Sequence, residues 1–417
     1  MPRSGPVPAP AVSLPAHPQR TISDLPASVR STLETLDQLL LDACSPHAEA
    51  AKTRVPPQAW PELLARAEAH KVSNLVLARW ETRTSDLSED VRARRRRAAA
   101  GNLAYAGRLL ELISLHEKAG IPALPFKGPV LAETVFGGIP NRSFRDLDLL
   151  VPRAELGRAC ILLIDLGYRP LHDVGLAEYL RITLRGGHHV GLRHQRHGTH
   201  VELHWEMAGR YLPVDLDWET VEPFLGGVGF CEREVLTLSP ETGLLYLCVH
   251  GAKEYWRILD HVVCVAWHLE RRPPDWNRVL DLARRWGGER ILLTGLGLAA
   301  QLFEVTLPKA IAGMITVSPA VRRLVERQSR RIFAEDRLTT LRLDSLPEFL
   351  RMHWTQLGDP VHFLRWVARR MTTPAVEDLE RAEPPAQVGD DSPKTVFQMA
   401  DMRAPMQAVR RLVGRRG

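Results

Sequence analysis

The chain has few of the features that mark secreted, zinc-bound or membrane proteins. Its five cysteines among 417 residues are scattered, odd in number and without a C-x-x-C pair, so neither a disulfide framework nor a zinc ribbon is expected. The longest apolar run, residues 291–305, is too short and too interrupted to cross a bilayer about 30 Å thick. Residues 1–25 lack the continuous apolar stretch of a signal peptide. These absences predict a cytoplasmic protein without a membrane partner.

Lysine and aromatic residues are also scarce. Only seven lysines stand among 55 basic residues, so arginine carries the net charge of +6. Five arginines lie within residues 92–97, where a solvated helix face or loop is the simpler interpretation and a patch for a polyanion such as RNA is the alternative. RNA binding without chemistry would need aromatic residues among the basic ones, and aromatics make up 6% of the chain. Nucleic acid therefore stays an unproven partner.

Hydrophobic periodicity divides the chain into five segments. At 45% hydrophobic and 25% charged residues, the composition is that of a folded protein. Apolar residues recur at helical spacing on both sides of a central segment in which strand and helix patterns alternate. The expected organisation is a disordered tail at 1–25, a helical region at 26–120, an α/β core at 121–236, a helical domain at 237–370, and a tail at 371–417 that carries at most one short helix.

The central segment alternates strands and helices. Prolines, glycines and turn residues mark the element ends. The expected order is a strand at 121–128, a helix at 129–138, a strand at 146–151, a helix at 152–168 and a β-hairpin at 188–207.

Two acidic strands in this segment carry the candidate chemistry. Side chains alternate between the faces of a strand, so Asp146 and Asp148 project from one side. The second strand of the hairpin has the same alternation, with His200, Glu202 and His204 on one face. If this strand lies beside the first, Glu202 becomes a third carboxylate.

Three converging carboxylates raise each other's pKa unless a cation balances them. Mg²⁺ prefers oxygen ligands and keeps positions for water and substrate phosphate, which makes it the expected ion. The competing interpretation is an exposed strand end where the aspartates pair with Arg142 and Arg145. Glu206 is the alternative third carboxylate. The succession of strand, helix, arginine-bearing loop and two acidic strands favours the metal site.

Several stretches together resemble a known family. "FKGPVLAETVF", "RSFRDLDLLV", "HVELHWEM" and "LLYLCVHGAKEYW" are similar to bacterial nucleotidyltransferases with a DNA-polymerase-β-like catalytic core. The similarity extends from about residue 100 to residue 375. It implies an α+β fold, in which a small mixed β-sheet core is flanked by N-terminal and C-terminal helical domains.

The resemblance also implies an activity and a set of site residues. The activity is the Mg-dependent transfer of a nucleoside monophosphate from an NTP to an unidentified acceptor, a small molecule, protein or RNA, with two Mg²⁺ ions and release of pyrophosphate. Asp146, Asp148 and Glu202 are the implied catalytic residues and metal ligands. The implied contacts to the nucleotide are Lys127, Gly128, Arg142, Arg145 and His204.

The phosphate-binding turn departs from the family pattern. Pro129 follows Gly128 and donates no backbone N–H, so the phosphates depend more on Lys127 and on the arginines that precede the aspartates. The gap from Gly128 to Asp146 is also longer than usual. Pro129 favours the alternative function, a catalytically silent nucleotide-binding or regulatory accessory protein of a biosynthetic or toxin-antitoxin system, whereas the intact acidic trio argues against it.

Histidines gather in the hairpin at 188, 189, 194, 197, 200 and 204. They form no familiar ligand motif with cysteine, so zinc is not expected. His204 is expected to orient Glu202 or the acceptor. His250 is expected to pack between helices, with a place beside Lys253 in the acceptor cleft as the alternative.

Overall fold

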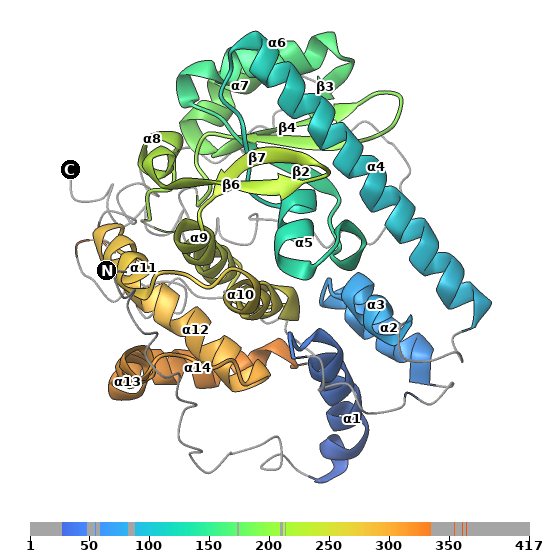
Figure 1. Ribbon diagram of the computed structural model, residues 1–417, viewed down its shortest axis with the longest axis vertical. Coiled ribbons are helices and arrows are strands. Elements are labelled where there is room, and N and C mark those ends of the chain that lie inside the picture. Colours follow the sequence, from blue (N-terminus) through green and yellow to red (C-terminus); the bar gives the residue numbers. More distant parts are fainter. Residues whose placement is uncertain are drawn as a thin grey trace, which may run out of the picture.

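The computed structural model places a small β-sheet beside a larger body of helices (Figure 1). It describes residues 27–47, 59–81, 88–172, 175–208 and 214–334, with single residues at 55, 212, 354, 361 and 364. The two expected tails lie outside the described residues, as does most of the segment from 335 to 370. In the described part of the chain, every helix is too short or too polar to span a bilayer.

The main sheet has five strands in the order β1-β2-β5-β4-β3. Strand β2 pairs in parallel with β5, and the other neighbours are antiparallel, which confirms the predicted small mixed sheet and α+β fold. The parallel register sets Asp148 opposite Glu202. The strands are β1 (Leu124–Pro125), β2 (Asp146–Leu150), β3 (Tyr168–Pro170), β4 (His189–His194) and β5 (His200–His204).

One face of this sheet is a hydrophobic core. Leu147 and Leu203 are fully buried there, against α4 (Glu89–Ala119) and α6 (Leu156–Asp165). Helix α4 begins at the Ser88 side chain, which accepts a hydrogen bond from the third helical amide, and it ends at a glycine in the left-handed conformation. Because side chains alternate along a strand, the polar residues of β2 and β5 lie on the face opposite to these buried leucines.

The core contains elements that the sequence patterns did not predict. They are β3, α7 (Leu176–Gly186) and a second two-stranded sheet of β6 (Leu225–Phe230) and β7 (Arg233–Leu238). Strand β6 has three glycines in six residues, which weakens its strand signal. Helix α7 follows Gly175, which provides no side-chain cap. The region also holds α5 (Gly128–Phe136), α8 (Trp218–Val221), η3 (Ile139–Asn141), η4 (Arg153–Glu155) and η6 (Glu222–Phe224).

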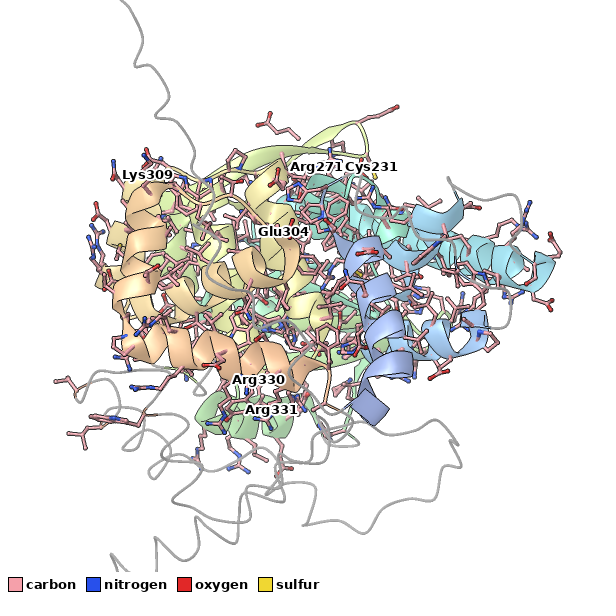
Figure 2. The ribbon with its side chains drawn as sticks, turned by 90° about the horizontal axis from the view of Figure 1, so that it is seen from below. Cys231, Arg271, Glu304, Lys309, Arg330 and Arg331 are labelled. Carbon is pink, nitrogen blue, oxygen red and sulfur yellow. The ribbon has the colours of Figure 1, made fainter. Side chains whose placement is uncertain are left out.

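The helices outside the sheet region form one body with a common hydrophobic core. Nε1 of Trp267 donates a hydrogen bond to the carbonyl of Cys44 at 2.7 Å, which ties the C-terminal helices to the N-terminal ones. Figure 2 shows this body from below, with Lys309 and Arg330 at its outer edge. Its helices are α1 (Ala27–Cys44), α2 (Trp60–Ala69), α3 (Ser73–Glu81), α9 (Pro240–Lys253), α10 (Leu259–Arg271), α11 (Trp276–Arg285), α12 (Glu289–Phe303), α13 (Lys309–Val317) and α14 (Pro319–Ile332).

Candidate functional site

The polar face of β2 and β5 gathers the three predicted carboxylates. Ligand atoms of Asp146, His200 and Glu202 lie within 4.8 Å of one another, and so do those of Asp148, Glu202 and His204. Both aspartates are therefore neighbours of Glu202. The arrangement follows from the parallel register, which aligns Asp146 with His200 and Asp148 with Glu202.

His204 bridges two of the carboxylates. Its Nε2 lies 3.0 Å from Oδ1 of Asp148 and 3.2 Å from Oε2 of Glu202. Burial opposes a charge on this ring, but the two acidic partners outweigh it and raise the pKa of His204. The His204 ring thus lies between Asp148 and Glu202 and links the two side chains. The ring packs edge-on against Phe126.

Lys127 also lies beside Asp148. Its Nζ lies 3.4 Å from Oδ1 of Asp148, and burial is outweighed by Asp148 and then Tyr246, which together raise the pKa of Lys127 well above its usual value. Gly128 follows with φ of +53°, and a Cβ there would come within 3.3 Å of the carbonyl oxygen of Asp146. This close approach in a left-handed conformation requires glycine. Lys127 is thereby fixed at the edge of the acidic strand.

The charges of the cluster are not evenly balanced. Burial, followed by the charges of Asp148 and Glu202, raises the pKa of Asp146 to about 6. At Asp148 burial acts in the same direction, but Lys127 and His204 outweigh it and lower the pKa. The pKa of Glu202 is held well below its usual value, since the nearby histidines overcome its burial. Asp146 is therefore the carboxylate with the least compensation.

The two predicted arginines take different positions. Nη2 of Arg142 donates to Oδ2 of Asp260 at 3.2 Å, in an ion pair where both side chains are largely buried. Nδ2 of Asn102 donates to the Arg142 carbonyl at 2.7 Å, so Arg142 fastens the loop before β2 to α10 and α4. Arg145 has an exposed side chain, and its carbonyl accepts a hydrogen bond from the hydroxyl of Tyr105 at 2.8 Å. The partner Asp260 was missed from the sequence because it lies 118 residues away.

More histidines lie at this site than the strand pattern indicated. Nε2 of His189 is 3.7 Å from Oε2 of Glu202, and ring nitrogens of His188, His189 and His204 lie within 4.8 Å of one another. Nζ of Lys253, at the end of α9, is 3.4 Å from Nε2 of His188. The C-terminal helices thus reach the edge of the cluster.

Other candidates lie elsewhere. Glu206 pairs with Asp217 in an isolated β-bridge beyond the end of β5, and among the described residues it belongs to no group that could hold a metal ion. His250 is half-buried between helices, where its ring stacks on Tyr246 and meets His261 edge-on.

The arginine run lies inside α4, and one of its members is buried. Arg95 is buried and donates to the carbonyl of Pro140 in η3 and, at 2.9 Å, to the side chain of Asn141. Its neighbours Arg94 and Arg96 form ion pairs with Glu68 and Glu89. The run thus lies on a helix, which is one form of the simpler interpretation, but Arg95 is buried and not solvated.

Comparison with known proteins gives the family. Residues 56–304 match the family described as an uncharacterised nucleotidyltransferase. The match covers more than half of the chain, and the protein belongs to this family, as the sequence resemblance predicted. Among solved structures, the chain is similar to the antibiotic-resistance factor ANT(2'')-Ia, with 12% identity over 54% of this chain and 98% of that chain and a TM-score of 0.26. A comparison with curated protein sequences finds no match.

Proposed function

We propose that the protein is a Mg-dependent enzyme that transfers a nucleoside monophosphate from an NTP to an acceptor and releases pyrophosphate. The supporting observation is the convergence of Asp146, Asp148 and Glu202 on one face of the sheet, in a chain of a nucleotidyltransferase family. Carboxylates from adjacent strands at this spacing suit a hard divalent ion and the phosphates that it carries.

The charge of the site fits a bound cation. Burial, followed by the negative charges of Asp148 and Glu202, raises the pKa of Asp146 to about 6, so a cation beside this carboxyl group would stabilise its ionised form. Asp146, Asp148 and Glu202 would hold the metal, as two Mg²⁺ ions in this proposal. Bound Mg²⁺ neutralises the triphosphate and polarises the phosphoryl group under attack.

The protein side chains then position the reactants. Lys127 and the exposed Arg145 bind the phosphates that leave, which compensates for the missing amide of Pro129. The acceptor oxygen forms a bond to the α-phosphorus as the bond to the bridging oxygen of pyrophosphate breaks, and the acceptor proton passes to solvent. Because the pKa of Glu202 lies far below its usual value, we assign it to metal binding rather than to proton abstraction.

Label transfer tests the proposal. Purified protein with Mg²⁺ and each α-labelled NTP is expected to label itself, RNA, or a small molecule in a cell extract. Asp148→Asn is expected to abolish this transfer, because it removes one of the three proposed metal ligands. This carboxylate is also the one that lies nearest to Lys127 and His204. Asp165→Asn, an exposed position at the end of α6, is the matched control and should transfer at the wild-type rate.

The alternative, a silent or regulatory nucleotide-binding protein, gives a different result. It predicts Mg-dependent nucleotide binding in calorimetry without labelled product from any of the four bases. Absence of both binding and product would refute the proposed site altogether.

A further inference from the structure

Three imidazole rings surround the carboxylate of Glu202. The closest approaches are 3.2 Å from Nε2 of His204, 3.7 Å from Nε2 of His189 and 4.0 Å from Nε2 of His200. Alternation along β5 and its antiparallel pairing with β4 bring these rings to the same face as the aspartates. Nitrogen donors therefore stand among the oxygen donors of the candidate metal site.

His200 lies beside the carboxylates, and its Nε2 approaches Oε1 of Glu202 at 4.0 Å, which is too long for a hydrogen bond. It stands opposite Asp146 in the register of β2 and β5, and a ring nitrogen lies within 4.8 Å of ligand oxygens of Asp146 and Glu202. Its Nε2 is buried and makes no hydrogen bond within the described residues. Nε2 of His204, by contrast, already bonds to Asp148. A buried polar atom without a partner is costly, so its retention needs an explanation.

The strand beside His200 leaves room for its ring. Gly191 lies opposite Glu202 on β4, and a Cβ there would come within 3.0 Å of Nε2 of His200 and 2.6 Å of a methyl group of Leu171. A residue with a Cβ at this position would therefore crowd the imidazole and the Leu171 side chain. The backbone amide of Gly191 donates to the hydroxyl of Tyr179 at 3.2 Å, which fixes the strand at this point. The niche that admits the His200 ring is thus built into the sheet.

We propose that His200 is a metal ligand together with Asp146 and Glu202, and that this mixed nitrogen and oxygen site takes a divalent transition-metal ion such as Mn²⁺ in preference to Mg²⁺. The inference rests on the proposed function, because it specifies the ion held by that same site. Imidazole binds first-row transition ions well, whereas Mg²⁺ favours oxygen ligands and gives up water reluctantly. Carboxylate oxygens accept both kinds of ion, so the imidazole is the group that discriminates.

Pulsed electron paramagnetic resonance of Mn²⁺ bound to the full chain tests this ligand directly. Coupling of the bound ion to a directly coordinated nitrogen is expected, and it should change to the ¹⁵N pattern when the protein is produced with ¹⁵N-labelled histidine. Titration of the free Mn²⁺ signal, with Mg²⁺ as competitor, should give an affinity for Mn²⁺ about 10-fold or more above that for Mg²⁺.

His200→Gln keeps a polar side chain but removes the imidazole. We expect loss of the nitrogen coupling and about 10-fold weaker Mn²⁺ binding, with Mg²⁺ binding changed by less than about twofold. His197→Gln, on the exposed turn of the same hairpin, is the matched control and should behave as wild type. A thermal melt of each variant checks its fold. The measurement with ¹⁵N-labelled histidine uses the wild-type chain, so it does not depend on whether a variant folds.

The outcomes separate this inference from the proposed function. Mn²⁺ binding without nitrogen coupling, or equal affinity for the two ions, would overturn the role of His200 and leave Mg-dependent transfer intact. Nitrogen coupling that survives in folded His200→Gln would assign the ligand to another histidine and likewise overturn it. If neither ion binds, with or without nucleotide, the proposed function fails as well.

Discussion

The two faces of the five-stranded sheet come from the same strands and use their side chains in opposite ways. Leu147 and Leu203 on one face are fully buried against α4 and α6. Asp148 and Glu202 on the other face are like charges, held together by His204 and Lys127. Each buried leucine contributes about 1.5–3 kcal/mol. The comparison indicates that the apolar face supplies the stability needed to hold repelling carboxylates at fixed positions.

The largest expected effect comes from the polar face. Glu202→Gln should reduce label transfer about 10³-fold, a loss of ~4 kcal/mol in transition-state stabilisation, because it removes a metal ligand that both aspartates approach. The measurement is kcat/KM per folded molecule with the best NTP. A Glu202→Gln variant that keeps more than a tenth of the wild-type kcat/KM would contradict the assignment of catalysis to the polar face.

Substitution of Leu203, the next residue along β5 and on the apolar face, should lower stability and leave label transfer almost unchanged. Leu203→Ala is expected to lower the free energy of unfolding by about 2–5 kcal/mol, since it opens a cavity under α4 and α6. Transfer per folded molecule should stay within about twofold of wild type. Leu103→Ala, at an exposed position of α4, is the control for denaturant unfolding and should change stability by less than about 0.5 kcal/mol. A Leu203 variant that unfolds at the wild-type denaturant concentration would refute the stabilising role of that face.

Buried histidines outside the sheet provide a contrast in pH dependence. Burial lowers the pKa of His261 and of His268 to about 4, whereas acidic partners raise that of His204. Between pH 6.5 and 4 the unfolded chain therefore binds protons at His261 and His268 that the folded chain does not. Stability from these two groups is present above pH 6.5 and falls by about 3 kcal/mol per histidine toward pH 4. The contribution of His204 has the opposite sign, since it is full below pH 6.5 and declines as pH rises.

Urea unfolding between pH 7 and pH 4 measures this dependence. His268→Gln should flatten the pH profile, because glutamine can still donate to the carbonyl of Pro240 and does not titrate. An unchanged slope would show that His268 binds its proton in the folded state.

The smallest expected effect is a gain in stability. Asp146→Asn should raise the free energy of unfolding of metal-free protein at pH 7 by about 1–2 kcal/mol, because burial and the two neighbouring carboxylates disfavour the ionised form. The gain should shrink as the pH falls below 6, where the folded wild-type chain takes up the proton, and should be lost near pH 4, where the unfolded chain takes it up as well. Melting in chelator checks this, and Asp165→Asn is the neutral comparison. A lower melting temperature for Asp146→Asn would mean that its carboxylate is compensated in the fold.

The acidic strands were the most predictable part of the site. The alternation of Asp146 and Asp148, and of Glu202 within the hairpin, is a local property of the sequence, and the structure places these residues on one face. Pro129 in the first turn of α5 and Gly137 after its end predicted that helix correctly. Strand alternation and helix end residues were sufficient here, because both depend on residues that are close together in the sequence.

Contacts between distant segments were not predictable. The pairing of Arg142 with Asp260, and the approach of His189 to Glu202, depend on tertiary docking and on the register of β4 with β5. The Gly-rich β6 is stable as a strand because it pairs with β7 along its whole length, which its own propensity does not indicate. Tertiary context overrides local preference at these positions.

The shared core of the helical body has a consequence for synthesis on the ribosome. Trp267 bonds to Cys44 across 223 residues, and the amide of Leu259 donates to the ring of His70 across 189 residues. Contacts of such high sequence separation form late and slow folding. The N-terminal helices leave the exit tunnel first, so their apolar surface stays exposed to solvent until the C-terminal helices that cover it have been synthesised. We expect nascent chains that stop before α10 to depend on chaperones for solubility.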